Sequence, residues 1–414
     1  MIRVLSVSMP RSGHHVLEMV LTRLLRDRFH YCEFYTIPDC CRSIPCVRTD
    51  VVERSDSLMF MQKTHDHDLT DPKVAGLDGL VIQVREPVAR MLSNYELHLR
   101  SERIPHSISY QRLWMGLEAF YTVGFVNKWC GPIPNGLLLK YEDLTGDPVG
   151  YFSRLFEHFR LPSEMLDGGA VLGAMRYSSD DQTMFRPRQV ERSLYSDAEL
   201  IGEFCRLVDE AAQRLGYDLR QRVGGAAGNA QMGQIYKYKL LVSSNRLDEA
   251  LRLLDLYLAG SDPDVMAKRW RPNLLACLGR TDEAVREYEI LLDTLPPYSA
   301  TSVKYAELLA RTGHTIRAKK VIADCLAAAE DKSRAAELIL AKFAECELSK
   351  PALEFAPPRS LSRQDVVDAF RLLLGREPES EQTVKAHQKE RSMDDLRRIL
   401  ILSEEFADKY ASIG

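Results

Sequence analysis

The chain has 414 residues, of which 45% are hydrophobic and 28% are charged, so a wholly disordered, collagen-like or low-complexity protein is excluded. Its net charge is −4, from 55 basic and 59 acidic residues, which argues against a generic nucleic-acid-binding protein. The length indicates two or three domains, since one hydrophobic core rarely grows beyond about 250–300 residues.

The chain begins with a short apolar run. Pro10 and Arg11 interrupt this run before the core of a signal peptide could form. No uninterrupted apolar run approaches the roughly 18–20 residues of a membrane span. We therefore expect a cytoplasmic protein without a transmembrane segment.

The first half of the chain, 1–222, alternates strand-like and helix-like segments. Short apolar runs predict buried strands at 2–8, 80–84 and 136–140. Apolar periodicity predicts helices at 16–25 and 198–216. Buried strands that alternate with helices are typical of a parallel sheet covered on both faces, so we predict an α/β domain.

An anion cradle is predicted where the first strand meets the first helix, in the sequence SMPRSGHHVL that starts at Ser8. Arg11 offers a charge, Ser12 offers a hydroxyl, and Gly13 lets the backbone approach an anion at a helix N-terminus. The Walker pattern is absent, because no Lys follows Gly13, and this disfavours a triphosphate-hydrolysing enzyme. An ordinary junction between a strand and a helix is the alternative interpretation.

A cysteine-rich stretch follows the first helix. The chain has nine cysteines, and four of them lie close together near His30: Cys32, Cys40, Cys41 and Cys46. No clean pair of CxxC elements is present, so free buried thiols in a reducing compartment are favoured over a zinc site.

Two further segments carry candidate chemistry. Lys63, Thr64 and His65 follow a short apolar stretch, and the carboxyl edge of a parallel sheet is where such folds bind ligands. His65 can accept a proton from a hydroxyl at neutral pH, although His67 is a rival base and a polar surface turn is the alternative. Arg85 ends the strand at 80–84, and Ser93 lies eight residues later on a helix that starts after a proline, so both can converge on one anion.

Together and in this order, the three segments resemble the cytosolic-type sulfotransferases, which use 3′-phosphoadenosine 5′-phosphosulfate (PAPS) as donor and whose fold resembles the nucleotide kinases. SMPRSGHHVL is similar to the family's 5′-phosphosulfate loop, KTH at 63–65 to its catalytic Lys-Thr-His, and Arg85 with Ser93 to its 3′-phosphate pair. LKYEDL at 139–144 is similar to a segment whose Tyr, here Tyr141, lies near the nucleotide. FRPR at 185–188 resembles a degraded form of the late phosphate-binding segment.

The resemblance implies a metal-free reaction in which an acceptor hydroxyl attacks the donor sulfur and PAP leaves. It implies His65 as the base, with Lys63 and Arg11 stabilising the sulfuryl group and the leaving phosphate. The donor-binding residues that it implies are Arg11, Ser12, Gly13, His14, His15, Arg85, Ser93, Tyr141, Arg186 and Arg188. His14 and His15 replace small hydroxyl residues of the family and can instead donate imidazole N–H groups to phosphate. Arg11 replaces the usual Lys, as in carbohydrate-type members.

The second half of the chain contains a repeat. A linker is predicted at 223–231, where GGAAG occurs. After it, equivalent positions recur every 34 residues: Asn245, Gly279 and Gly313, then Ala250, Ala284 and Ala318. This period resembles tetratricopeptide repeats, which we expect over 232–350, with a plain helical bundle as the alternative. Residues 360–414 resemble a small helical module appended to bacterial enzymes of surface-sugar metabolism.

The predicted protein is therefore a P-loop-like α/β sulfotransferase domain followed by an all-α solenoid and a small helical domain. We expect the acceptor to be the hydroxyl of a carbohydrate or glycolipid, with a lipid, polyketide or other small alcohol as alternatives. The repeats are expected to hold a long acceptor, bind a protein partner or mediate self-association. A small-molecule kinase and a catalytically lapsed scaffold are the rival functions.

Overall fold

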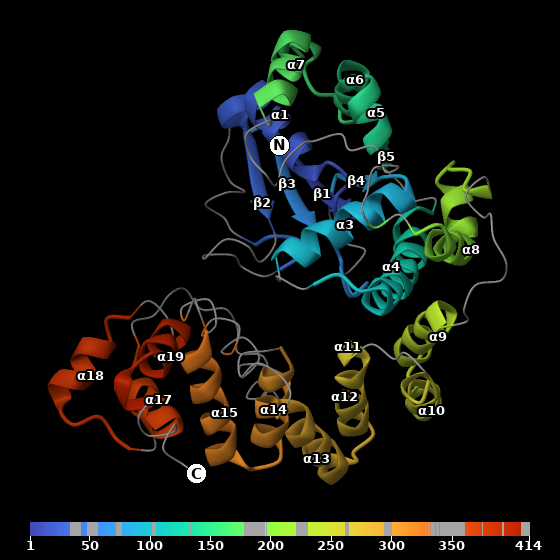
Figure 1. Ribbon diagram of the computed structural model, residues 1–414. Helices are drawn as coiled ribbons and strands as arrows, with labels where there is room; N and C mark the ends of the chain where they lie inside the picture. The colour runs from blue at the N-terminus through green and yellow to red at the C-terminus, as the bar shows by residue number, and fades with distance from the viewer. Residues whose placement is uncertain are drawn as a thin grey trace. The chain divides into compact units, whose positions relative to one another are not determined.

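The computed structural model (Figure 1) describes residues 1–33, 43–47, 57–71, 77–101, 105–131, 135–177, 195, 197–220, 231–260, 265–293, 300–329, 332, 336, 339, 361–374, 376–390 and 393–406. These residues form two compact units, Met1–Asn245 and Arg246–Gly414. The unit boundary lies beyond the linker expected at 223–231, most of which falls outside the described residues.

The first unit is built on one parallel sheet. Its strands are β1 (Ile2–Ser8), β2 (Phe29–Glu33), β3 (Met59–Thr64), β4 (Gly79–Val84) and β5 (Gly136–Lys140), in the spatial order β2-β3-β1-β4-β5. All four neighbouring pairs are parallel. The carboxyl ends of all five strands therefore meet at one edge of the sheet, and the predicted α/β class with a parallel sheet is confirmed.

Helices cover both faces of this sheet, because alternate residues of the central strands are apolar on opposite sides. Val4 and Val81 face a core with α1 (His14–Leu25), α6 (Pro148–His158) and α7 (Gly168–Tyr177). Leu5 and Ile82 face the opposite core, which α4 (Ile108–Trp129) helps to form (Figure 1). The shorter elements on the first side are η1 (Arg26–Arg28), α5 (Tyr141–Gly146) and η2 (Ser163–Met165).

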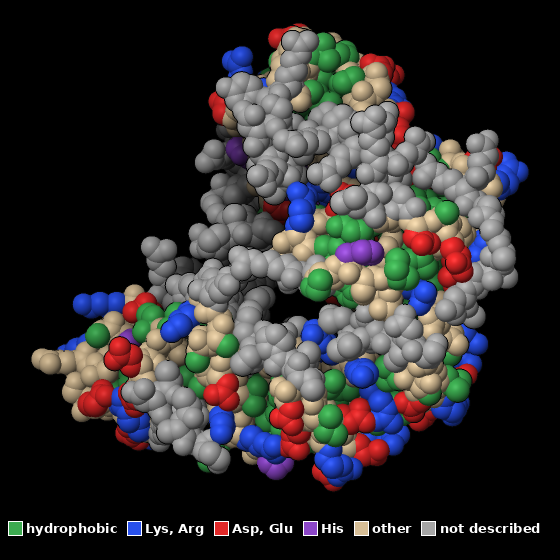
Figure 2. Space-filling view, viewed as in Figure 1, with side chains coloured by type: hydrophobic (Ala, Val, Ile, Leu, Met, Phe, Trp, Pro, Cys, Tyr) green, Lys and Arg blue, Asp and Glu red, His purple; other side chains and the backbone are tan. Residues whose placement is uncertain are grey.

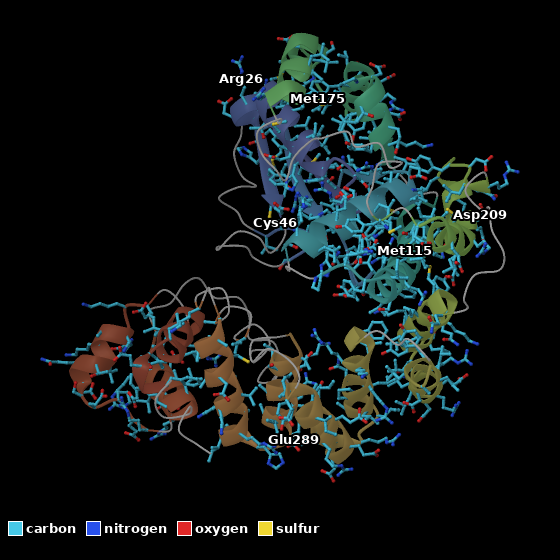
Figure 3. All side chains as sticks on the ribbon, in the orientation of Figure 1. Arg26, Cys46, Met115, Met175, Asp209 and Glu289 are labelled. Atoms are coloured by element: carbon cyan, nitrogen blue, oxygen red, sulfur yellow. The ribbon has the colours of Figure 1, made fainter. Side chains whose placement is uncertain are left out.

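A second helical layer lies beside α4. Helix α3 (Pro87–Ser101) and α8 (Ala198–Arg214) pack with α4 around buried apolar residues that include Met115 and Phe204 (Figure 3). Helix α9 (Gln231–Ser243) also packs on α4. A Cβ added at Gly116 of α4 would lie 2.9 Å from Ile235 of α9, so glycine permits this close approach. The helix expected to open the repeats thus belongs to the first unit.

The second unit begins with paired helices at the 34-residue spacing. They are α10 (Leu247–Leu258), α11 (Val265–Lys268), α12 (Trp270–Cys277), α13 (Thr281–Leu292), α14 (Ala300–Arg311) and α15 (Thr315–Ala328). Gly279 and Gly313 turn between helices with φ of 74° and 84°. The alanines five residues after each turn, Ala284 and Ala318, are fully buried where helices approach each other.

The last helices share a core with the helices before them. They are α17 (Arg363–Leu374), α18 (Glu381–His387) and α19 (Met393–Ile401). Phe370 and Leu400 from this segment lie in one apolar cluster with Ile322 and Leu326 of α15. Residues 361–406 therefore extend the second unit. Figure 2 shows acidic and basic side chains intermixed over this unit, and no helix among the described residues is long and apolar enough to cross a membrane.

Candidate active site at the carboxyl edge of the sheet

The turn between β1 and α1 forms a tight cradle. Arg11 and Gly13 both adopt left-handed backbone conformations, with φ of 69° and 88°, and α1 begins directly after Gly13. A Cβ at Gly13 would lie 2.9 Å from side-chain atoms of both Leu144 and Tyr141. The first N–H groups of a helix have no intrahelical acceptor, so this turn presents donors and a positive dipole end. The buried Ser12 hydroxyl has no hydrogen-bond partner in the described structure.

Arg11, Arg85 and Ser93 meet at this turn although they come from three different elements. The Nε of Arg11 donates a hydrogen bond to Oγ of Ser93 on α3, at 3.1 Å. The Nη1 of Arg85 donates to the carbonyl oxygen of Arg11, at 3.2 Å. The Arg85 guanidinium also lies 4.3 Å from the centroid of the Tyr141 ring. The structure thus brings four of the predicted donor-binding residues together.

His65 lies next to the same turn, directly after β3. Its Nδ1 is 2.7 Å from the Ser8 carbonyl oxygen and 3.1 Å from the Ser8 hydroxyl. A carbonyl oxygen only accepts hydrogen bonds, so Nδ1 carries the hydrogen and Nε2 is the basic nitrogen. Burial, aided by the positive charge of Lys63, lowers the pKa of His65 to about 3. The imidazole is therefore neutral at physiological pH.

Lys63 forms an ion pair with Glu33, a residue that the sequence analysis did not single out. The Lys63 side chain is only 4% exposed, and Glu33 is 26% exposed. Glu33 ends β2 and is in register with Lys63 on β3, so the two charges face each other across neighbouring strands. The sequence around Glu33 gives no local signal for this role, because the role depends on which strand lies beside β2.

The backbone of the His65 segment is fixed by α4. The Tyr121 hydroxyl donates to the carbonyl oxygen of His65, at 2.6 Å. The buried Asp66 carboxylate accepts from Nζ of Lys128 at 2.6 Å and from Nε1 of Trp129 at 2.8 Å. Asp66 has a φ of 44°, and these bonds hold the chain in that turn. The direction of the His65 ring is thus set from outside its own strand.

His14 occupies a different place from the one expected. Its Nε2 lies 2.9 Å from the Tyr31 hydroxyl, and its Nδ1 lies 2.9 Å from Oε1 of Gln83. Burial holds the pKa of His14 well below its ordinary value. Because both ring nitrogens are engaged by side chains of the sheet, this imidazole does not supply the expected N–H group for phosphate. His15, the next residue, is exposed.

Glu142 is a second residue that the sequence analysis missed. One carboxylate oxygen accepts from the backbone N–H of Glu86 at 2.9 Å, and the other accepts from the Tyr217 hydroxyl at 2.6 Å. Glu86 and Glu142 directly follow Arg85 and Tyr141 in the chain. Glu142 therefore ties together the segments that hold the guanidinium against the aromatic ring.

The structure does not describe four of the residues singled out in the sequence. Arg186 and Arg188 lie outside the described residues, as do Cys40 and Cys41. Cys32 and Cys46 are buried and pack around Phe60. Within the described part of the chain, no three His, Cys, Asp or Glu side chains are grouped so that they could hold a metal ion.

The edge of the sheet therefore combines three cations, Arg11, Arg85 and Lys63, with a neutral imidazole that has a basic nitrogen. Such a set can bind a polyanion and accept a proton from a nucleophile beside it. Comparison with models of protein families finds no match to the chain, and a search of curated proteins finds none either.

Proposed function

We propose that the first unit is a sulfotransferase that transfers the sulfuryl group of PAPS to an acceptor hydroxyl. One observation carries the proposal: Arg11, Arg85 and Ser93 converge at the turn after β1, and His65 lies beside that turn. The resemblance stated above assigned these residues to one ligand, and they come from segments up to 82 positions apart.

The residues of the turn fit a phosphosulfate group. Gly13 lets the turn pack closely against Tyr141 and Leu144 in a left-handed conformation, and the helix N-terminus that follows offers backbone N–H groups to an anion. Ser12 has a buried hydroxyl that finds no hydrogen-bond partner among the described residues. In the proposed complex, the turn and Arg11 bind the 5′ end of the donor, while Arg85 and Ser93 bind the 3′-phosphate. Tyr141, already stacked under Arg85, lies near the nucleotide.

In the proposed reaction, the acceptor oxygen attacks sulfur and gives its proton to Nε2 of His65. The new S–O bond forms as the bond from sulfur to the 5′-phosphate oxygen breaks, and PAP leaves with that electron pair. Lys63 and Arg11 stabilise the charge that develops on the transferred group and the leaving oxygen. Positioning and electrostatic stabilisation do most of the work, by analogy with phosphoryl transfer, and cationic side chains take the place of a metal ion.

Glu33 modifies this chemistry because it neutralises Lys63. The ion pair places a carboxylate at the edge where the negative sulfuryl group would lie. The Glu33 carboxylate and the sulfuryl group are both negative and repel each other. We therefore infer that donor binding draws the Lys63 ammonium toward the sulfuryl group and loosens its contact with Glu33. Glu33 is also a second group at this edge that can accept a proton.

We further propose that the second unit is a tetratricopeptide-like solenoid with a helical extension, fused to a P-loop-like sulfotransferase domain. The support is the recurrence of turns and buried alanines at a spacing of 34 residues, at Gly279, Gly313, Ala284 and Ala318. The proposed acceptor is a carbohydrate or glycolipid hydroxyl. Two resemblances support it: Arg11 replaces the usual Lys as in carbohydrate-type members, and the C-terminal helices resemble a module of surface-sugar enzymes. The repeats are proposed to hold a long acceptor or a partner protein.

The proposal is tested by incubating the full chain with radiolabelled PAPS and fractionated cell extract, and by measuring PAP binding by calorimetry. We expect a labelled organic product, and His65→Ala should lower turnover by about 10²–10⁴-fold while PAP binding persists. His158→Ala, an exposed histidine at the end of α6, is the matched control.

Other outcomes favour the rivals. Turnover of ATP that depends on magnesium would indicate a kinase, and PAP binding without transfer to any alcohol would indicate a lapsed scaffold. If His65→Ala stays active and Glu33→Gln does not, the proton acceptor is Glu33. Failure of PAP to bind the unaltered protein would contradict the proposed function.

A further inference from the structure

His67 is a second imidazole beside the proposed base. It follows His65 by two residues, and their ring centroids are 5.2 Å apart. The His67 ring also lies 6.2 Å from the centroid of Tyr121, the residue that fixes the His65 backbone. The His67 side chain is exposed, whereas His65 is partly buried. The mechanism described above gives His67 no role.

The environment of His65 disfavours a lasting positive charge. Its Nδ1 hydrogen is already given to the Ser8 carbonyl, so a proton taken from an acceptor resides on Nε2. The resulting cation is largely buried and stands near the Lys63 ammonium, and both effects lower the pKa of His65. The proton must therefore leave His65 before another acceptor can be deprotonated.

The surroundings of His67 are more favourable to a transient cation. The pKa of His67 is lowered, chiefly by desolvation and also by Lys63, but the carboxylates of Glu118, Asp68 and Asp66 oppose this shift. Glu118, on α4, has the largest of these favourable effects. Asp66 is already paired with Lys128. His67 thus has the His65 imidazole beside it, and a carboxylate from a different helix favours its protonated form.

Glu118 is held firmly in place. One of its oxygens lies 2.6 Å from Nη2 of the fully buried Arg90, and the other accepts from Nδ2 of Asn94 at 3.0 Å. Arg90 Nη2 also donates to the hydroxyl of Thr122, at 2.8 Å. These contacts join α3 to α4 and fix the carboxylate, so its field at His67 does not depend on a flexible side chain.

We propose that His67 is the proton exit of the site: it receives the proton from Nε2 of His65, directly or through one water molecule, and releases it to solvent under the influence of Glu118. The inference rests on the proposed function. The step is a transfer of H⁺ alone, in which an N–H bond on His65 breaks, one on His67 forms, and solvent water takes the proton in turn. His67 acts through His65 and does not contact the reacting atoms.

The first test measures turnover of the full chain with radiolabelled PAPS. The acceptor is either the cell-extract fraction that becomes labelled in the experiment above, or water. His67→Ala should lower turnover by less than the roughly 10²–10⁴-fold loss expected for His65→Ala. Added imidazole should restore the rate of His67→Ala and should leave the rate of the His158→Ala control unchanged. Unchanged turnover in His67→Ala, or a loss that imidazole and more concentrated buffer leave untouched, would overturn the inference.

The second test needs no turnover. Nuclear magnetic resonance of protein with ¹⁵N-labelled histidine follows the two rings as pH changes. Glu118→Gln should shift the His67 titration downward, because a carboxylate is lost, whereas His65→Gln should move it little, because the His65 imidazole is neutral over this pH range. A His67 titration that Glu118→Gln leaves in place would overturn the relay. PAP calorimetry on the same samples tests the proposed function separately, so the two failures are distinguishable.

Discussion

Arg11 donates a hydrogen bond from Nε to the Ser93 hydroxyl, at 3.1 Å, across 82 positions of the chain. The resemblance assigns these side chains to opposite ends of the donor, yet in the described structure they are joined by a hydrogen bond. The contact shows that the turn after β1 and the second turn of α3 lie next to each other. A donor that binds here must exchange this bond for contacts of its own.

The Arg11–Ser93 contact leads to a prediction about donor affinity. Ser93→Ala should weaken PAP binding by about 10–100-fold, because a hydrogen bond to a charged group contributes about 1.5–3 kcal/mol. Isothermal calorimetry measures the change. Ser101→Ala, on an exposed residue at the end of the same helix, should leave the affinity unchanged. Equal losses in the two variants would argue against a role of Ser93 at the phosphate.

Gly13→Ala is expected to reduce both stability and PAP binding. The added methyl group would meet Leu144 and Tyr141 at 2.9 Å, and alanine disfavours the φ of 88°. Strain of this kind costs about 1–3 kcal/mol. Urea denaturation gives the change in unfolding free energy. Gly146→Ala is the control, since among the described residues no atom beyond its own stretch of helix lies within 4 Å of its Cβ position; a similar effect there would contradict the explanation.

We expect a double-mutant cycle to show a favourable coupling free energy between Lys63 and Glu33. Glu33→Gln should destabilise the protein because the buried ammonium loses its counter-charge, and Lys63→Met should destabilise it less. The double variant should be more stable than the sum of the single losses predicts. Urea denaturation of the four proteins measures the coupling. Strict additivity would mean that the pair makes no net contribution.

His65 should make the protein less stable in acid. The pKa of its folded form is lowered to about 3, whereas the unfolded chain has the ordinary value of 6.5, so the unfolded state binds more protons below pH 6.5. The stability from the neutral imidazole is complete above pH 6.5 and is lost as pH falls toward 3. By pH 5 this loss amounts to about 2 kcal/mol. His65→Gln should flatten the change in unfolding free energy between pH 7.5 and 5, and an equally steep profile would contradict the assignment.

Donor binding should reverse part of that shift. The phosphates of PAP would bring negative charge close to the imidazole, and negative charge favours its protonated form. The pKa of His65, measured by nuclear magnetic resonance, should therefore rise when PAP is added, toward a value suited to a general base. The resonances of His158, on the far end of α6, should not move. A constant pKa would place PAP away from His65.

Features that depend on neighbouring residues in the chain were accessible from the sequence. The strands at 2–8, 80–84 and 136–140 were predicted because buried strands are continuous apolar runs. The 34-residue period predicted the turns at Gly279 and Gly313, since only a few residue types adopt a positive φ readily. The parallel sheet followed from strands alternating with helices, whereas the joint action of Arg11, His65 and Arg85 was predicted from the resemblance to sulfotransferases.

Strand order and long-range packing decided the rest, because no local pattern encodes which segments become neighbours. Glu33 became part of the site only because β2 lies beside β3 in a register that places it opposite Lys63. His14 turned inward because Tyr31 and Gln83, on two other strands, satisfy its ring nitrogens. The sequence by itself determined which residues have suitable chemistry and where strands and turns begin; the tertiary structure alone decided their partners, since burial energy is gained between segments far apart in the chain.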